Sequence, residues 1–96
     1  MKKVLIIGAG GIGKRHIKGY LETKRALISI VEPDKDKIIK IQKEFSIDKT
    51  YTSIESVNLD QFDLAIICSP ANKHVDAMKI CAQNKLSFMV EKPLST

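Results

Sequence analysis

One loop, residues 8–13 with the sequence GAGGIG, constrains the fold of this 96-residue chain more than any other feature. A short continuous apolar run at residues 4–7 precedes the loop and is typical of a strand that is buried on both faces of a parallel sheet. A helical pattern begins at Gly11 and extends to about Lys24, with apolar and aromatic residues at i, i+4 spacing. The pattern therefore predicts a strand, a tight turn and a helix in immediate succession.

Strand-like and helix-like segments alternate along the rest of the chain. Strands are expected at residues 27–31, 50–52, 62–68 and 86–90, and helices at about 33–45 and 72–84, with a brief helical segment between them that Ser53 opens as its N-cap. In the helix at 72–84, Val75, Met78 and Ala82 are expected to face the core. Short connections imply right-handed crossovers and a mostly parallel sheet. The expected fold is α/β, a Rossmann-type doubly wound sheet with strand order 3-2-1-4-5 that stops before the last helix and strand of that fold.

Three glycines of the loop have the spacing G-x-G-x-x-G, namely Gly8, Gly10 and Gly13. Gly8 permits the tight turn out of the strand, Gly10 lets a pyrophosphate approach the main chain, and Gly13 lets the helix lie close to the sheet. The unpaired N–H groups and the positive end of the helix dipole favour a diphosphate there. We therefore expect Gly8, Gly10, Gly11, Ile12 and Gly13 to bind a dinucleotide; a glycine-rich turn that binds nothing is the alternative.

Glu32 follows the second expected strand, 24 residues after Gly8. A carboxylate near this offset accepts hydrogen bonds from the adenosine ribose hydroxyls and repels a 2′-phosphate, so NAD is expected rather than NADP. Lys35 lies close enough in sequence to leave NADP open, and an exposed glutamate at a strand end is the other interpretation of Glu32. Lys14 and Arg15 either add charge near the phosphates or are simply solvated.

The fourth expected strand ends at the sheet edge where ligands bind in this fold. Ser69, Pro70 and Asn72 follow it and are expected to pass along the nicotinamide side of the cofactor. Asn72 either caps the next helix or contacts the ligand. For His74 there are also two interpretations, since an imidazole suits proton transfer near neutral pH, but a histidine in a first helical turn commonly packs or caps.

Charge and composition exclude several classes of function. The net charge of +5 suggests nucleic acid as a partner, but many of the lysines alternate with acids along residues 35–49 without an aromatic stacking platform, so a solvated helix face is expected instead. No apolar stretch approaches the roughly 20 residues of a membrane span, and the apolar run after Met1 stops too early for a signal peptide, which predicts a cytoplasmic protein. Cys68 and Cys81 have no zinc-ligand spacing, so free thiols and no metal are expected.

Three groups of residues make the whole chain resemble the amino-terminal domain of the Gfo/Idh/MocA oxidoreductases. They are, in chain order, the glycine loop with His16 three residues after it, Ser69-Pro70 with His74, and Glu91-Lys92-Pro93 after the fifth expected strand. The last tripeptide is the most family-specific element. The resemblance implies an NAD(P)-dependent dehydrogenase that transfers hydride between nicotinamide and a hydroxyl carbon of a sugar, a cyclitol or a sugar nucleotide.

The resemblance also implies the roles of two residues. Lys92 is expected to be catalytic and to touch the substrate hydroxyl, because an ammonium stabilises charge on that oxygen while hydride moves. Glu91 is expected to orient this lysine or the nicotinamide ribose. Pro93 is expected to fix the turn that follows them.

Family members continue into an antiparallel carboxyl-terminal domain that carries a catalytic histidine and most substrate contacts, and nothing in this sequence matches that domain. We therefore expect residues 1–96 to form only the dinucleotide-binding domain, inactive by itself, of a parent protein that can be a homo-oligomer. The alternative is a stand-alone nucleotide-binding or NAD-sensing module without catalysis.

Overall fold

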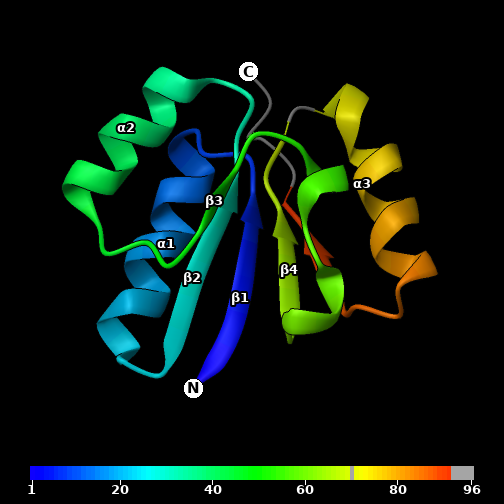
Figure 1. Cartoon of the computed structure of the whole chain (residues 1–96), viewed down its shortest axis with the longest axis horizontal. Coiled ribbons are helices and arrows are strands. Elements are labelled where there is room, and N and C mark those ends of the chain that lie inside the picture. The colour runs from blue at the N-terminus through cyan, green and yellow to red at the C-terminus, as the bar shows by residue number, and fades with distance from the viewer. Residues whose placement is uncertain (70, 92–96) are drawn as a thin grey trace.

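The computed structural model describes residues 1–69 and 71–91, which fold around a five-stranded parallel sheet (Figure 1). The elements follow one another as β1 (Lys2–Ile7), α1 (Gly11–Thr23), β2 (Ala26–Val31), α2 (Lys35–Glu44), β3 (Thr50–Tyr51), the 3-10 turns η1 (Ile54–Ser56) and η2 (Leu59–Gln61), β4 (Leu64–Ile67), α3 (Ala71–Gln83) and β5 (Phe88–Val90). The order of strands in the sheet is β3-β2-β1-β4-β5, so the predicted order is confirmed.

Strand β1 occupies the centre of the sheet. It pairs in parallel with β2 at every position from Lys2 to Ile7, and its other edge pairs in parallel with β4. A central parallel strand sends side chains into both flanking layers, and this explains why its sequence is apolar without alternation. Val4, Leu5 and Ile6 are accordingly at most 1% exposed.

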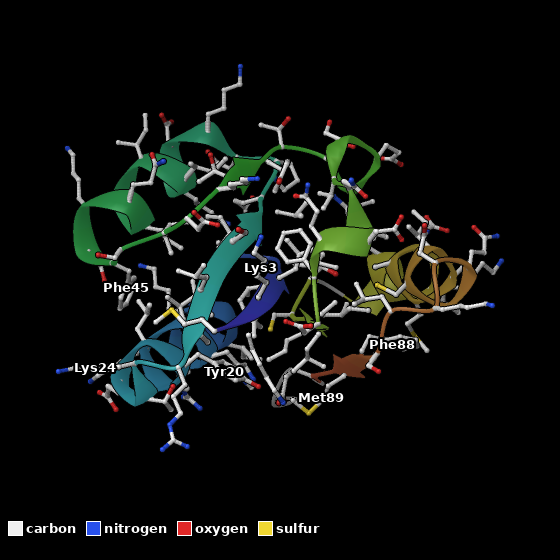
Figure 2. All side chains as sticks on the ribbon, turned by 60° about the horizontal axis from the view of Figure 1, so that its bottom comes forward. Lys3, Tyr20, Lys24, Phe45, Phe88 and Met89 are labelled. Atoms are coloured by element: carbon white, nitrogen blue, oxygen red, sulfur yellow. The ribbon has the colours of Figure 1, made fainter. Side chains whose placement is uncertain are left out.

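The sheet separates two apolar layers. Helices α1 and α2 cover one face, and α3 together with the 3-10 turns covers the other (Figure 1). Successive side chains of a strand point to opposite faces, so neighbouring residues of β1 supply different layers. Ile6 lies in the α1–α2 layer, where Phe45 packs against the core, whereas Leu5 lies in the α3 layer, where Phe88 packs (Figure 2).

The connection from β3 to β4 contains two 3-10 turns. Ser53 caps the first turn as predicted, because its Oγ accepts a hydrogen bond from the Glu55 N–H. The second turn was not predicted; Asn58 caps it through Oδ1, and Leu59 is buried in the α3 layer. The crossover therefore covers this part of the sheet with short turns instead of a helix.

The predicted inward face of α3 is wrong. Val75 is 56% exposed and Met78 is 36% exposed, whereas Ala77 and Cys81 are 6% and 0% exposed and pack on the sheet. The helix carries apolar residues on two stripes, and periodicity fixes their spacing but not which stripe faces inward. The smaller side chains occupy the buried stripe, and Ala82 is exposed with the other one.

Strands β4 and β5 are shorter than predicted. The apolar segments 62–68 and 86–90 include Phe62 and Leu86, which lie before the strands and are buried by turn packing. Phe62 closes η2 with its N–H on the Leu59 carbonyl, and the Leu86 N–H bonds the Cys81 carbonyl at the end of α3. Within the described residues, no helix combines the length and apolar character needed to cross a membrane.

Gly13 is a position where the fold itself requires glycine. A Cβ on Gly13 would overlap the carbonyl oxygen of Gly8 and would lie 3.5 Å from Ile6 Cγ2. Because the Gly8 carbonyl is part of the backbone and cannot move aside, we predict that Gly13→Ala lowers the free energy of unfolding by about 1–3 kcal/mol.

The control for Gly13→Ala is Gly19→Ala on the same helix, where a Cβ would meet no atom within 4 Å. This control should raise the free energy of unfolding by about 0.5–1 kcal/mol through helix propensity. Urea unfolding followed by circular dichroism measures both variants. Equal stability of wild type and Gly13→Ala would contradict the close contact between the start of α1 and the Gly8 carbonyl.

Candidate dinucleotide-binding site

A cleft of about 600 Å³ opens at the carboxyl ends of the strands. It lies where β1 and β4, adjacent in the sheet, lead into connections on opposite faces of it, which is the place where open α/β sheets bind ligands. Its lining comes from the ends of four strands and the connections after them, and includes Gly8, Glu32, Asp34, Ser53, Ser69 and Asp76. The strand order therefore brings together residues from the first, second, third and fourth strand ends.

The amino end of α1 faces this edge without a capping side chain. Gly10 occupies the N-cap position in extended backbone, and within the described part of the chain no side chain bonds the helix terminus. The first helical hydrogen bond runs from the Lys14 N–H to the Gly10 carbonyl at 2.9 Å. The N–H groups of Gly11, Ile12 and Gly13 precede it and have no intrahelical acceptor. Such a terminus attracts an anion.

Space beside this terminus is open. A Cβ added at Gly10 or at Gly11 would meet no protein atom within 4 Å. The two other loop glycines differ, because Gly8 and Gly13 are enclosed by backbone. The protein fold alone therefore does not require glycine at position 10 or 11, and the open space fits a group that must come close to the main chain.

Gly8 joins two strand ends. Its φ of +99° lies in the region that favours glycine, and a Cβ there would approach the backbone N of Ser69 to 2.7 Å. The absence of a side chain thus allows the turn after β1 and the turn after β4 to touch. Ser69 Oγ is buried beside this contact and has no hydrogen-bond partner among the described residues. A buried hydroxyl without a partner is costly, so it suits an incoming polar group.

Glu32 is buried at the end of β2, with 7% of its surface exposed. Its Oε1 accepts a hydrogen bond from the Ala9 N–H at 3.0 Å, and its Oε2 accepts one from the Asp34 N–H at 2.9 Å. Each carboxylate oxygen can accept a further bond, so the group remains able to take ribose hydroxyls. The contact with Ala9 was not foreseen: Glu32 also holds the glycine loop against β2.

Three lysines border the outer side of the glycine loop. A second hollow of about 240 Å³ is lined by Ala9, Gly10, Gly11, Lys14, Lys37 and Lys40. From the sequence, Lys14, Arg15 and Lys35 were the basic residues expected near the cofactor. In the structure, Lys37 and Lys40 lie beside the loop together with Lys14. Their i, i+3 spacing on one face of α2 was the available signal. Lys14 also pairs with Glu44 at 3.5 Å, an exposed contact that contributes little.

The other predicted residues follow β4 and β5 in the sequence. Helix α3 begins at Ala71, which puts Asn72 and His74 in its first turn. Pro70, Lys92 and Pro93 lie outside the described residues. Glu91 directly follows β5, and its N–H bonds the Ile67 carbonyl at 2.9 Å, which continues the pairing with β4.

Cys68 lies between these groups at the end of β4. Burial and the negative charge of Glu91 raise the pKa of its thiol to about 11. The thiol is therefore protonated at neutral pH and adds no charge to the site. The buried Cys81 is also a free thiol, and burial raises its pKa as well.

The residues of the cleft fit a dinucleotide. Along the sheet edge, the buried carboxylate follows β2, the uncapped helix terminus with its open space at Gly10 and Gly11 follows β1, and the buried serine hydroxyl follows β4. This is the order of adenosine ribose, diphosphate and nicotinamide half in a dinucleotide. These features define a Rossmann-type dinucleotide-binding domain. Residues 2–96 match the Gfo/Idh/MocA oxidoreductase family with its NAD-binding Rossmann fold. The chain belongs to this family, as the sequence resemblance implied.

Known relatives are much longer than this chain. The myo-inositol 2-dehydrogenase of Thermotoga maritima is 28% identical over 98 residues, which cover 97% of this chain and 28% of that protein. An oxidoreductase from Agrobacterium radiobacter, solved with NAD+, L-tartaric acid and magnesium, has the same fold with a TM-score of 0.86 and 22% identity, over 99% of this chain and 28% of that one. A probable dehydrogenase from Thermotoga maritima has a TM-score of 0.86 and 26% identity, over 97% and 28% of the two chains. The chain spans less than a third of the curated relatives it matches.

Replacing Glu32 by Gln tests its two hydrogen bonds. Gln has one acceptor oxygen and one NH2 group, so it can accept from the Ala9 N–H or from the Asp34 N–H but not from both. One buried N–H then faces a donor, and we predict that Glu32→Gln lowers the free energy of unfolding by about 1–3 kcal/mol. Denaturant unfolding measures this change, with Glu44→Gln on exposed α2 as the matched control. If Glu32→Gln is as stable as wild type, the hydrogen bond from the Ala9 N–H to Glu32 does not hold the glycine loop.

The environment of Cys68 predicts slow alkylation. With a pKa of about 11 in place of 9.0, the thiolate fraction at pH 8 is about a hundredfold lower than for an unperturbed thiol. The rate of iodoacetamide labelling, assigned to Cys68 by peptide mass spectrometry, should rise with pH until about pH 11. Glu91→Gln removes the negative charge and should move this profile to lower pH. A labelling rate that levels off near pH 9 in the wild type would show that Cys68 is neither buried nor close to the Glu91 charge as described.

Proposed function

We propose that this chain binds NAD across the cleft and forms the cofactor-binding part of a dehydrogenase for a hydroxyl carbon of a sugar, a cyclitol or a sugar nucleotide. The observation that carries the proposal is the uncapped amino end of α1 beside two glycines that the fold itself does not require. Family membership supports the cofactor, and the inositol dehydrogenase among the relatives supports the substrate class.

The glycine loop holds the diphosphate in this proposal. The N–H groups of Gly11, Ile12 and Gly13 donate to phosphate oxygens, and the bare Cα of Gly10 lets those oxygens approach. Gly8 contributes by turning the chain away from β1. Glu32 accepts hydrogen bonds from the adenosine ribose hydroxyls with the lone pairs that the Ala9 and Asp34 N–H groups leave free.

NAD is preferred to NADP because a buried carboxylate repels a 2′-phosphate at the ribose. Lys14, Lys37 and Lys40 line the neighbouring hollow, and they compensate part of that repulsion. We therefore propose that the chain binds NADP weakly and NAD strongly.

Residues after β4 and β5 serve the nicotinamide half. Ser69 gives its buried hydroxyl to the cofactor, which resolves its lack of a partner. Pro70, Asn72 and His74 are proposed to bind the same half of the cofactor, and Glu91 accepts a hydrogen bond from the nicotinamide ribose or orients the residue that follows it.

Lys92 is the proposed catalytic residue, on the strength of the Glu91-Lys92-Pro93 tripeptide. When bound, NAD supplies a nicotinamide ring that takes hydride from the substrate carbon or returns it. The Lys92 ammonium donates a hydrogen bond to the substrate oxygen and stabilises the negative charge that this oxygen develops, while a base of the second domain takes the hydroxyl proton. An ammonium is suited to this task because it donates up to three hydrogen bonds and carries the opposite charge.

The remaining contacts of the reaction belong to a second domain in this proposal. A substrate-binding domain, in the same polypeptide or in a partner chain, adds the groups that hold the sugar ring, and homo-oligomers form through it. The free thiols Cys68 and Cys81 support a reducing, cytoplasmic location.

Gly10→Val is expected to weaken cofactor binding with little effect on the stability of the fold. The free protein leaves room for the valine Cβ, which would have no neighbour within 4 Å, but the side chain occupies the space of the diphosphate. We predict at least about tenfold weaker NADH binding, or ~1.4 kcal/mol, with less than about 1 kcal/mol lost in the free energy of unfolding.

NADH fluorescence titration measures the affinity of Gly10→Val. The control is Gly19→Ala, which alters a glycine of the same helix away from the cleft and should leave NADH affinity unchanged. If Gly10→Val binds NADH as tightly as wild type, the cofactor does not lie against the loop and the proposal fails.

A further inference from the structure

Helix α1 reaches the end of β5 through one side-chain pair. His16 Nε2 lies 3.0 Å from Glu91 Oε1, although the two residues are 75 positions apart in sequence. A carboxylate can only accept, so Nε2 carries the proton of this hydrogen bond. The contact therefore fixes which ring nitrogen of His16 is the donor.

Both residues have firmly held backbones. His16 lies three residues after Gly13, where α1 rests on the Gly8 carbonyl without room for a side chain. The Glu91 N–H bonds the Ile67 carbonyl at 2.9 Å, which ties it to the β4 end. What the pair adds is thus the orientation of the Glu91 side chain, which would otherwise be free to adopt several rotamers.

The pair contributes little to folding. The His16 and Glu91 side chains are 22% and 34% exposed, and an ion pair or hydrogen bond with that much solvent contact adds little stability. The charge of Glu91 also helps to raise the pKa of the Cys68 thiol. Among the described residues, the hydrogen bond that holds the Glu91 carboxylate comes from the His16 imidazole.

We propose that His16 is a positioning residue, which holds the Glu91 carboxylate in place for the nicotinamide half of the cofactor and for the lysine that follows it in sequence. The inference rests on the proposed function, since it needs the cofactor to lie in the cleft. His16 itself touches neither cofactor nor substrate; it acts through Glu91. By this device the same helix that receives the diphosphate also sets the side chain that follows β5.

The test compares two ligands on the full 96-residue chain. NADH extends to the nicotinamide end, whereas ADP occupies only the adenosine and diphosphate end. We expect His16→Phe, which keeps a ring but removes the donor, to weaken NADH binding about three- to fivefold and to leave ADP binding unchanged. His16→Gln, which retains an N–H donor at the position of Nε2, should restore most of the NADH affinity.

Tyr20→Phe is the matched control on the same helix, because Tyr20 packs against the α1–α2 layer and forms no hydrogen bond with Glu91 in the part of the chain that the structure describes. Its NADH and ADP affinities should equal those of wild type. Equal losses of NADH and ADP affinity in His16→Phe, or no loss of either, would overturn the positioning role. Failure of the wild type to bind NADH at all would instead overturn the proposed function.

A double-variant cycle with His16→Leu decides the case if His16→Phe folds poorly. Glu91→Met keeps the length of the side chain and removes both acceptor oxygens that His16 could reach. In the Glu91→Met background, changing His16 to Leu should have no additional effect on NADH affinity, because the acceptor is already absent. Independent, additive losses would show that His16 does not act through Glu91.

Discussion

The start of helix α1 packs directly against the turn that ends β1, and the absence of side chains at Gly8 and Gly13 makes this close packing possible. The contact fixes the direction in which the helix leaves the sheet, so its first N–H groups face the edge where the strands end. Gly8 also touches the backbone of Ser69, which joins the β1 end to the β4 end. The position of the cleft, its anion-attracting terminus and the location of the buried serine all follow from these backbone contacts.

Two glutamates complete this arrangement from opposite ends. Glu32 at the end of β2 accepts from the Ala9 N–H, and Glu91 after β5 accepts from His16. Each carboxylate thereby links the end of another strand to the loop or helix that follows β1. Both keep unused lone pairs, so a group that organises the protein also remains available to a ligand. The ends of β2 and β5 are in this way both tied to one central unit, β1 with its loop and helix.

Much of the fold was predictable because it depends on local chemistry. The apolar run of β1, the glycine spacing and the alternation of elements were enough for the strand order, and the offset of Glu32 was enough to bring it to the cleft. Long-range geometry was not predictable in the same way. The choice between two apolar stripes on α3 depends on side-chain volume against the sheet, as the buried Cys81 and exposed Val75 show. The pairing of His16 with Glu91 depends on the order of strands and on a rotamer, neither of which is a property of a short segment.

The strands of the described sheet shorten from its centre outward, from six residues in β1 and β2 to two in β3 and three in β5. Long unpaired edge strands act as templates on which other chains add strands and aggregate. The two longest strands, β1 and β2, both have neighbours on both sides, and the short outermost strands expose few free main-chain groups. The short outer strands thus limit self-association through the margins of the described sheet.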